Sequence, residues 1–359
     1  MKRRRLWLAV GTICLGLIVT GLAFTPASAQ QAQKQISLKA SHNAPRNITV
    51  ALAYEAWGKE IERRTNGQAK FEFYWASSLL KVTETVKGTG AGIADVCFDV
   101  PGYHPSETPL VTIGELGYIT KTGDSAARAL TELYEQYPVF KKEFEQHNLK
   151  VMFFVPFPPN ILGVVKPART LEDIKGKKIR ALGLLNEVVA KLGGTPVGIS
   201  LNDMYESLSR KVIEGYTGFG LSGVKGFKLD EACKNYIDFG YGSYNVGIVF
   251  FNMDKWNSLP PEIRKVIEEV NTKAIDIYVD VFAKAEPPDV APLKDSGCTF
   301  YTLPEGEMNR WKNLVVPGIW NGWIERQKQY GPSQEFFNRY LELVKKYEPR
   351  SRYVNPFPK

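Results

Sequence analysis

One arginine at the end of a short predicted strand is the side chain that this sequence most clearly arranges for binding. Residues 170–176 predict a helical turn ended by a glycine, and Lys177–Ala181 predict a strand that carries Arg180 near its carboxyl end, where open α/β sheets hold ligands. A guanidinium forms two parallel hydrogen bonds with a carboxylate, so an organic acid is one candidate partner. The other is a surface ion pair with Asp173 or Glu172, and the residues alone do not choose between them.

Further candidates are aromatic and polar residues at the ends of predicted strands, where a cleft between two lobes would open. They are His42, Trp75, Tyr103, Asn160, Tyr216 and Phe219. Each aromatic ring has an alternative place in the hydrophobic core. For His42 and Asn160 the alternative is a turn residue that the nearby backbone satisfies.

Several motifs for catalysis or metal binding fail in their context. Gly88–Gly92 resembles a nucleotide loop, but it follows a predicted helix and precedes a strand, the reverse of a dinucleotide site. The three histidines, at positions 42, 104 and 147, lack the paired spacing of a zinc site. No Gly-x-Ser-x-Gly elbow occurs, and no nucleophile is paired with a base. The sequence therefore predicts a binding protein without a metal or cofactor, not an enzyme.

The amino terminus has the pattern of a secretory signal. Four bases precede an apolar run from Leu6 to Phe24, and small residues at Ala27 and Ala29 predict cleavage after Ala29. Retention as a membrane anchor is the alternative. The remainder would then work in the periplasm.

Charge and cysteine content narrow the function further. The chain carries a net charge of +8, and the bases of residues 1–29 supply half of it, leaving +4. The other bases are scattered among acids, which disfavours a nucleic-acid partner. Cys97, Cys233 and Cys298 would remain after cleavage, and buried thiols or one Cys233–Cys298 bridge are the two alternatives.

The order of predicted elements indicates two α/β lobes. About 330 residues after cleavage exceed the size at which a single hydrophobic core keeps growing. Strands at 35–42, 69–75 and 94–100 alternate with helices at 48–64 and 81–87, which predicts a mostly parallel sheet. A helix at 125–146 and a strand at 150–155 follow, and the second lobe repeats this rhythm up to a strand at 213–219.

Two segments predict the crossings between the lobes. Pro156–Pro159 ends one strand, and Gly240–Asn245 precedes an apolar strand at 246–252 that we expect to return to the first sheet. The first lobe is thus expected to comprise residues 30–157 and 245–285. The second comprises 158–244 and 286–359, with its C-terminal helices packing back across the lobes. A long helix at 259–285 is expected to lie along both.

Seven motifs in this order resemble the DctP-type solute-binding proteins of TRAP transporters, exported proteins that deliver organic acids to a sodium-coupled permease. The motifs are Thr65–Gly67, Gly92–Asp95, Leu171–Arg180, Leu192–Val197, Met204–Leu208, Val212–Gly215 and Asn252–Pro260. The resemblance covers essentially the whole mature chain. It implies a two-lobed, class II-like periplasmic-binding-protein fold with a central cleft and a long helix spanning both lobes. It also implies that Arg180 holds the ligand's carboxylate, and that the partners are the small and large membrane subunits of a TRAP permease.

The resemblance adds Gly218 and Asn252 to the candidate ligand contacts, although Asn252 is as well placed to cap a helix. Departures from the family pattern bear on the ligand. Sugar-acid-binding members carry Arg at the position of Asn160 and Asn at that of Gly218. A keto-acid branch with a bound cation carries Glu at the position of Thr217 and Trp at that of Gly218. This chain therefore favours a monocarboxylate with a bulky or aromatic body over a metal-bridged ligand or a small dicarboxylate.

Three other functions stay open at the level of sequence. The same cleft could bind a C4-dicarboxylate or another small organic acid, or it could serve a ligand-sensing partner of a membrane receptor. An exported enzyme acting on a carboxylate is the third, although the chain lacks a recognisable acid–base or nucleophilic set.

Overall fold

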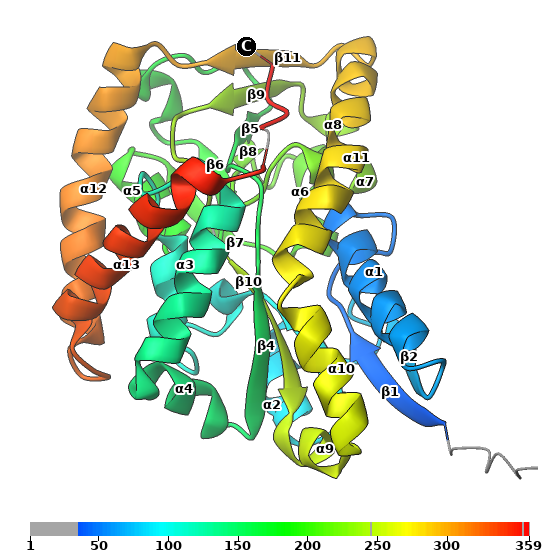
Figure 1. The fold of residues 1–359 in the computed structure, drawn as a ribbon. Coiled ribbons are helices and arrows are strands. Elements are labelled where there is room, and N and C mark those ends of the chain that lie inside the picture. The colour runs from blue at the N-terminus through cyan, green and yellow to red at the C-terminus, as the bar shows by residue number, and fades with distance from the viewer. Residues whose placement is uncertain (1–34, 245, 354, 359) are drawn as a thin grey trace, which may run out of the picture. The chain divides into compact units, whose positions relative to one another are not determined.

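The computed structural model describes residues 35–244, 246–353 and 355–358, and for residues 286–289 it describes the backbone but not the side chains. The predicted signal segment, residues 1–29, lies outside these ranges. The described residues form two sheets with helices packed against them, which confirms the two-lobed α/β prediction (Figure 1).

The first sheet has the strand order β2-β1-β3-β10-β4. Its strands are β1 (Ile36–Ser41), β2 (Ala69–Tyr74), β3 (Val96–Asp99), β4 (Leu149–Val155) and β10 (Gly247–Asn252). β1 pairs in parallel with β2 and β3, whereas β10 lies antiparallel between β3 and β4. The return of β10 to this sheet is thus confirmed. The prediction of a mostly parallel sheet is also confirmed, because β1, β2, β3 and β4 run in one direction and β10 is the strand that reverses it.

Helices cover both faces of the first sheet. They are α1 (Thr49–Arg64), α2 (Thr85–Gly90), α3 (Gly123–Gln136), α4 (Pro138–Glu145), α9 (Met253–Ser258), α10 (Pro261–Asn271) and α11 (Ala274–Asp295). Side chains alternate along β10, so that Val249 and Phe251 join the core formed with α1 and α10. Ile248 and Phe250 join the core formed with α3 and α4 on the opposite face.

The second sheet has the order β11-β9-β5-β8-β6-β7. Its strands are β5 (Leu162–Val164), β6 (Lys178–Ala181), β7 (Thr195–Gly198), β8 (Gly215–Tyr216), β9 (Asn235–Asp238) and β11 (Thr299–Thr302). The helices that follow along the chain are α5 (Leu185–Lys191), α6 (Met204–Ser209), α7 (Ser222–Gly226), α8 (Leu229–Ala232), α12 (Glu305–Gln327) and α13 (Ser333–Tyr347). Short 3₁₀ helices are η1 (Val82–Glu84), η2 (Pro101–Tyr103), η3 (Leu110–Glu115), η4 (Leu171–Ile174), η5 (Leu201–Asp203) and η6 (Glu348–Arg350).

The two sheets are joined where the chain crosses between them. β4 leads through the proline cluster to β5, and β9 leads back to β10. These two crossings pair with each other through an antiparallel bridge between Pro159 and Ser243, and the backbone N–H of Asn160 donates to the Gly242 carbonyl at 2.9 Å. α11 contacts α1 of the first lobe and α7 of the second, and α13 packs along α3. The residue boundaries of the lobes stay a prediction.

Three predicted elements differ from the structure. The helix expected at 125–146 is broken into α3 and α4 at Pro138, which has no N–H for the helix to bond. The helix expected at 259–285 is two helices, α10 and α11, because the helical conformation is interrupted at Thr272 and Lys273. The long helix is α11, which continues to Asp295. Only Gly215 and Tyr216 of the strand expected at 213–219 pair as β8.

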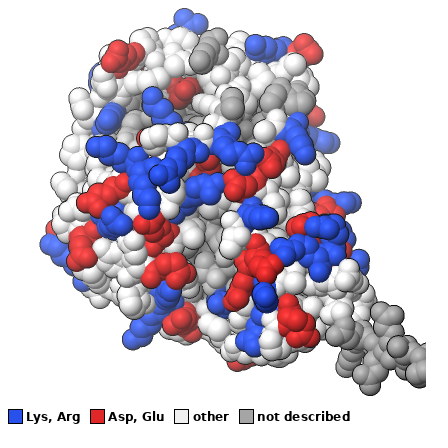
Figure 2. Space-filling model, viewed as in Figure 1, with Lys and Arg blue, Asp and Glu red and all other residues white. Residues whose placement is uncertain are grey.

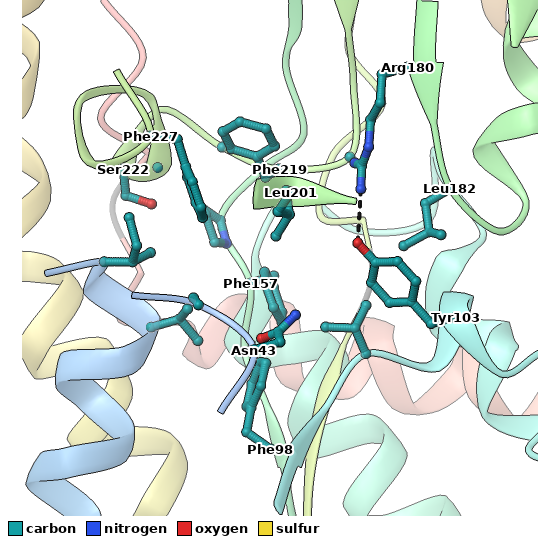
Figure 3. A pocket seen from close by; sticks show the side chains of 18 of the residues that line it. Asn43, Phe98, Tyr103, Phe157, Arg180, Leu182, Leu201, Phe219, Ser222 and Phe227 are labelled. Atoms are coloured by element: carbon teal, nitrogen blue, oxygen red, sulfur yellow. Dashed lines mark hydrogen bonds between the residues drawn. The ribbon is translucent and has the colours of Figure 1, made fainter. Parts of the chain in front are cut away.

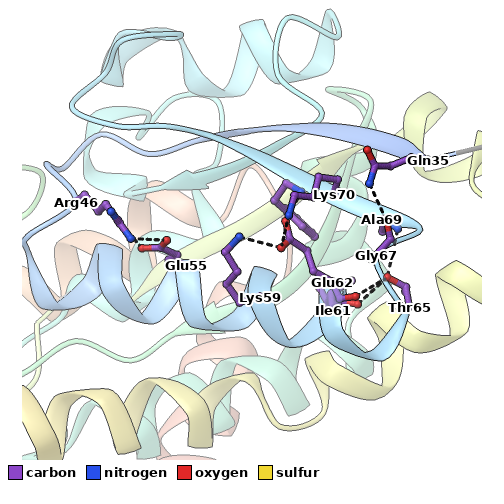
Figure 4. A network of polar contacts seen from close by, with 11 residues as sticks. Gln35, Arg46, Glu55, Lys59, Ile61, Glu62, Thr65, Gly67, Ala69 and Lys70 are labelled. Atoms are coloured by element: carbon purple, nitrogen blue, oxygen red, sulfur yellow. Dashed lines mark hydrogen bonds and ion pairs between the residues drawn. The ribbon is translucent and has the colours of Figure 1, made fainter.

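Ion pairs and hydrogen bonds between charged side chains connect elements at the surface of the fold. Glu62 of α1 is buried and accepts hydrogen bonds from Lys59, Lys70 and the backbone of Phe71, which ties α1 to β2 (Figure 4). Figure 2 shows basic side chains interspersed with acidic ones over the face that carries α11 and α13. Arg352, for example, pairs there with Asp276. Cys97, Cys233 and Cys298 are buried free thiols.

Candidate functional site

A small cavity opens between the two sheets, and residues from both lobes line it (Figure 3). Its volume is about 60 Å³, several times the roughly 10–15 Å³ that one buried water needs. It is lined by Asn43, Ala44, Ile48, Val50, Phe98, Val100, Tyr103, Phe157, Pro158, Arg180, Leu182, Leu201, Gly218, Phe219, Gly220, Ser222, Gly223, Phe227 and Phe282. Among these lining residues only Asn43, Tyr103, Arg180 and Ser222 carry polar side chains, and only Arg180 is charged. The cavity thus suits an apolar molecule with a negative group.

Arg180 stands on β6, and its side chain is buried at 1% exposure. Its Nε donates to the Ile199 carbonyl at 2.9 Å, its Nη1 to the Thr217 carbonyl at 3.1 Å and its Nη2 to the Tyr103 hydroxyl at 3.1 Å. Because a guanidinium has five N–H donors, one donor on Nη1 and one on Nη2 remain. These two can bind a carboxylate side by side.

The surface ion pair considered from the sequence does not form. Glu172 pairs with Arg310, and Asp173 closes a capping box with Thr170 at the start of η4. No carboxylate of the described residues forms an ion pair with Arg180. A buried guanidinium whose only described partners are neutral oxygens carries a full charge in a medium of low dielectric constant, and an anion in the cavity would stabilise it.

The backbone beside Arg180 is shaped to admit it. Gly218 has φ +106°, and a Cβ placed there would lie 2.9 Å from Arg180 Nη1. Asn160 lies behind this segment, where its Oδ1 accepts from the Gly218 N–H at 2.8 Å and its Nδ2 donates to Thr217 Oγ1 at 2.8 Å. Asn160 does not line the cavity; it fixes the segment after β8, whose Thr217 carbonyl accepts from the guanidinium.

Of the aromatic candidates, Tyr103 and Phe219 line the cavity. Tyr103 ends η2 of the first lobe, so its hydrogen bond to Arg180 joins the two lobes across the cavity. Tyr216 is buried one layer further back, stacked on Phe219 with ring centroids 5.1 Å apart. It supports the ring of Phe219 and does not line the cavity.

His42, Trp75 and Asn252 lie away from the cavity lining. The ring of His42 stacks on that of Phe98 with centroids 4.2 Å apart, and the ring of Trp75 is tilted against it at 5.7 Å. Asn252 caps α9 by accepting from the Lys255 N–H at 2.8 Å, and its amide donates to backbone carbonyls at the end of α2. The structure therefore shows a capping role for Asn252.

The protonation of His42 follows from its surroundings. Burial lowers the pKa of His42 to about 3, against a smaller opposing effect of the Ala44 backbone bond, so the imidazole is neutral. The Ala44 N–H donates to Nδ1 at 2.9 Å, which leaves the hydrogen on Nε2.

Comparison with known proteins assigns the family. Residues 40–323 match the model of the DctP family, described as bacterial extracellular solute-binding protein, family 7. The chain belongs to this family. Members of the DctP family are periplasmic, bind small organic acids and work with TRAP membrane subunits, as receptors for transport rather than as enzymes.

Individual relatives of this DctP-family protein are distant in sequence and close in fold. The outer membrane transporter protein TsaT of Comamonas testosteroni is 22% identical, over 89% of this chain and 93% of that protein. A TRAP periplasmic solute-binding protein of Desulfovibrio salexigens, solved as an open complex, is 27% identical with a TM-score of 0.74, covering 89% of this chain and 99% of the other. A TRAP solute-binding protein of Rhodoferax ferrireducens in complex with copurified benzoate is 20% identical with a TM-score of 0.80, covering 88% and 99%.

Two further properties of the described residues concern metal binding and membrane insertion. Among the described residues, no cluster of three or more His, Cys, Asp and Glu side chains is placed to hold a metal ion. None of the helices in the part of the chain that the structure describes has both the length and the hydropathy of a membrane span.

Sequence reasoning missed much of the cavity lining of this DctP-family protein. The residues not predicted include Asn43, Phe98, Leu201, Ser222 and Phe227. The sequence does place Asn43 in the same turn after β1 as His42, but it does not show which of the two side chains faces the cavity. The others give no local signal, since they lie at β3, at η5 and around α7, three segments that only the tertiary fold brings together.

Proposed function

We propose that this chain binds an organic monocarboxylate with an apolar, aromatic body in the cavity between the lobes, with Arg180 holding the carboxylate. The observation that carries the proposal is the buried Arg180 guanidinium with two N–H groups left over, beside a lining that is otherwise almost entirely apolar. The benzoate copurified with the Rhodoferax protein is one acid of this class.

We further propose that the chain delivers this acid to the small and large membrane subunits of a TRAP permease and catalyses no reaction. Residues 1–29 would direct it to the periplasm and be removed. Binding would keep the lobes closed, because the anion would complete the coordination of Arg180 at the point where Tyr103 of the other lobe meets it.

A small dicarboxylate fits this lining less well. Arg180 is the one cation among the described residues that line the cavity, so a second carboxylate would be buried without a counter-ion. A thermal-shift screen of benzoate-type acids against succinate-type acids separates the two classes. Stabilisation by succinate alone would contradict the proposal.

The decisive test is the removal of the guanidinium. We expect Arg180→Ala to weaken binding of the best aromatic acid by about 2–4 kcal/mol, roughly 30- to 1000-fold, because one partner of a buried charge pair is lost. Titration calorimetry measures this directly. Arg210→Ala is the control, since Arg210 is exposed on the surface beside Glu206 and should leave affinity unchanged. Less than a threefold change in Arg180→Ala would remove Arg180 from the site.

A further inference from the structure

A second polar group faces the cavity from the first lobe. Asn43 belongs to the turn after β1, its residue is only 7% exposed, and it lines the cavity. Figure 3 shows its amide directed into the space beside Phe157, apart from the guanidinium of Arg180. Its amide group forms no hydrogen bond with any of the described residues.

An amide in this position depends on the cavity for its hydrogen bonds, from water or from a ligand. Buried amides are almost always hydrogen-bonded, because transfer from water without a partner is unfavourable. The turn itself does not need the Asn43 side chain, since the Ala44 N–H is already satisfied by His42 Nδ1. The amide therefore has no structural partner that explains its burial.

Ser222 provides a comparable group from the second lobe. It begins α7 and lines the same cavity, and its hydroxyl has no hydrogen-bond partner among the described residues. In Figure 3, Phe227, Phe219 and Leu201 separate it from Arg180. The cavity thus has an anion-binding end at Arg180, an apolar middle, and neutral hydrogen-bonding groups away from the arginine.

We infer that the cavity selects acids that carry a neutral hydrogen-bonding substituent, a hydroxyl or an oxo group, on the part of the apolar body remote from the carboxylate. Asn43 is the residue that recognises this substituent, and Ser222 assists it. An amide offers both a donor and an acceptor, so it can pair with either group. Neither Asn43 nor Ser222 carries a charge, which disfavours a second carboxylate there. This inference rests on the proposed function, because it assumes that Arg180 orients the acid.

The expected consequence is discrimination against the unsubstituted acid. A site built to hydrogen-bond a substituent rejects the analogue that lacks it, because the buried amide is then left unpaired. We expect the protein to bind at least one of 3-hydroxybenzoate, 4-hydroxybenzoate or the hydroxyphenylacetates roughly tenfold or more tightly than benzoate or phenylacetate.

The test is the ratio of the two affinities, measured by titration calorimetry in the protein and in Asn43→Leu, which is similar in size and has no polar atoms. We expect Asn43→Leu to reduce the ratio about tenfold and Ser222→Ala to reduce it less. Asn47→Ala is the control, because Asn47 is exposed near the same turn and does not line the cavity; it should preserve the ratio.

Two results would overturn the inference. One is equal binding of hydroxylated and parent acids by the unaltered protein, and the other is an Asn43→Leu variant that weakens both acids by the same factor. Either result leaves aromatic-acid binding through Arg180 intact. Failure of the proposed function would look different, since no acid would bind, or Arg180→Ala would have no effect.

Discussion

Arg180 depends on its neighbours as much as on its own strand. The guanidinium can enter the cavity because position 218 has no Cβ, and it is aimed by carbonyl groups of Ile199 and Thr217. Asn160 in turn fixes Thr217 and Gly218. Asn160 and Gly218 thus serve together to position one arginine.

Substitution of Gly218 should therefore weaken ligand binding. In Gly218→Ala the new Cβ would lie 2.9 Å from Nη1 and the residue would keep φ +106°, which is strained for alanine. We expect a loss of stability of roughly 1–3 kcal/mol and about tenfold weaker binding, measured by thermal unfolding and calorimetry. Gly198→Ala is the control, because Gly198 has no atom within 4 Å of an added Cβ. Unchanged affinity in Gly218→Ala would show that Arg180 adjusts freely.

At the scale of elements, a charged histidine holds the segment that carries Tyr103. His104 Nδ1 lies 3.0 Å from Glu107 Oε2, and its Nε2 lies 3.2 Å from Asp99 Oδ1 and 2.8 Å from the Val82 carbonyl. Burial by itself lowers the pKa of His104, but the charges and hydrogen bonds of Asp99 and Glu107 outweigh it and raise the pKa to about 9. The imidazolium thus links η1, β3 and η2.

This linkage predicts a pH-dependent stability. The folded protein keeps the His104 proton up to about pH 9, whereas the unfolded chain releases it near 6.5, so the stabilisation is complete below pH 6.5 and is lost as the pH rises to 9. We expect His104→Ala to cost roughly 3–5 kcal/mol, because it leaves the buried Asp99 without its charged partner, with the Thr85 hydroxyl as its remaining hydrogen-bond donor. The melting temperature of the variant should fall less between pH 6.5 and 9. His147→Gln is the control; an identical pH slope in His104→Ala would contradict the assignment.

The sequence predicts the elements whose signal is local. β1, α1 and β2 begin and end within one or two residues of the expected ranges, because alternation and a helical stripe fix them. Helix boundaries are harder to predict at a proline, because a proline can either end a helix or lie within one. Pro138 ends α3 and begins α4, whereas Pro317 lies inside the continuous helix α12. Which outcome occurs depends on packing that a single segment does not reveal.

The residues of the candidate site divide in the same way, into those with a local sequence signal and those that only the tertiary fold reveals. Arg180 could be predicted, because a lone arginine at a strand end is a local pattern. Asn43 could not be distinguished from His42 beside it, since only the fold shows that one faces the cavity and the other stacks on Phe98. Ser222 and Phe227 belong to the second lobe, and their proximity to Asn43 exists only when both lobes are in place.

At the scale of the whole molecule, a buried acid joins the two lobes away from the cavity. Glu115, at the end of η3, accepts from the Leu184 N–H at 2.9 Å, next to α5 of the second lobe. Gly102 and Gly183 make room for it, since a Cβ at either would collide with its carboxyl group. Burial raises the pKa of Glu115 to about 8, against a smaller opposing effect of the Leu184 bond.

This acid gives the protein a second pH dependence at lower pH. The folded protein keeps the Glu115 proton up to about pH 8 and the unfolded chain releases it near 4.5, so this contribution to stability is complete below pH 4.5 and is lost as the pH rises to 8. Glu115→Gln stays neutral at every pH, so between about pH 5 and 6, before His104 contributes, its unfolding free energy should fall less steeply than that of the unaltered protein. Glu143, whose pKa is also raised by burial to about 8, accounts for the pH dependence that remains in this variant.

Glu172→Gln is the matched control, because the Arg310 hydrogen bond lowers the pKa of Glu172 to about 2 and confines its effect to acid pH. Chemical denaturation at several pH values measures each slope, and equal slopes in Glu115→Gln and the unaltered protein would mean that Glu115 is ionised at this junction of the lobes.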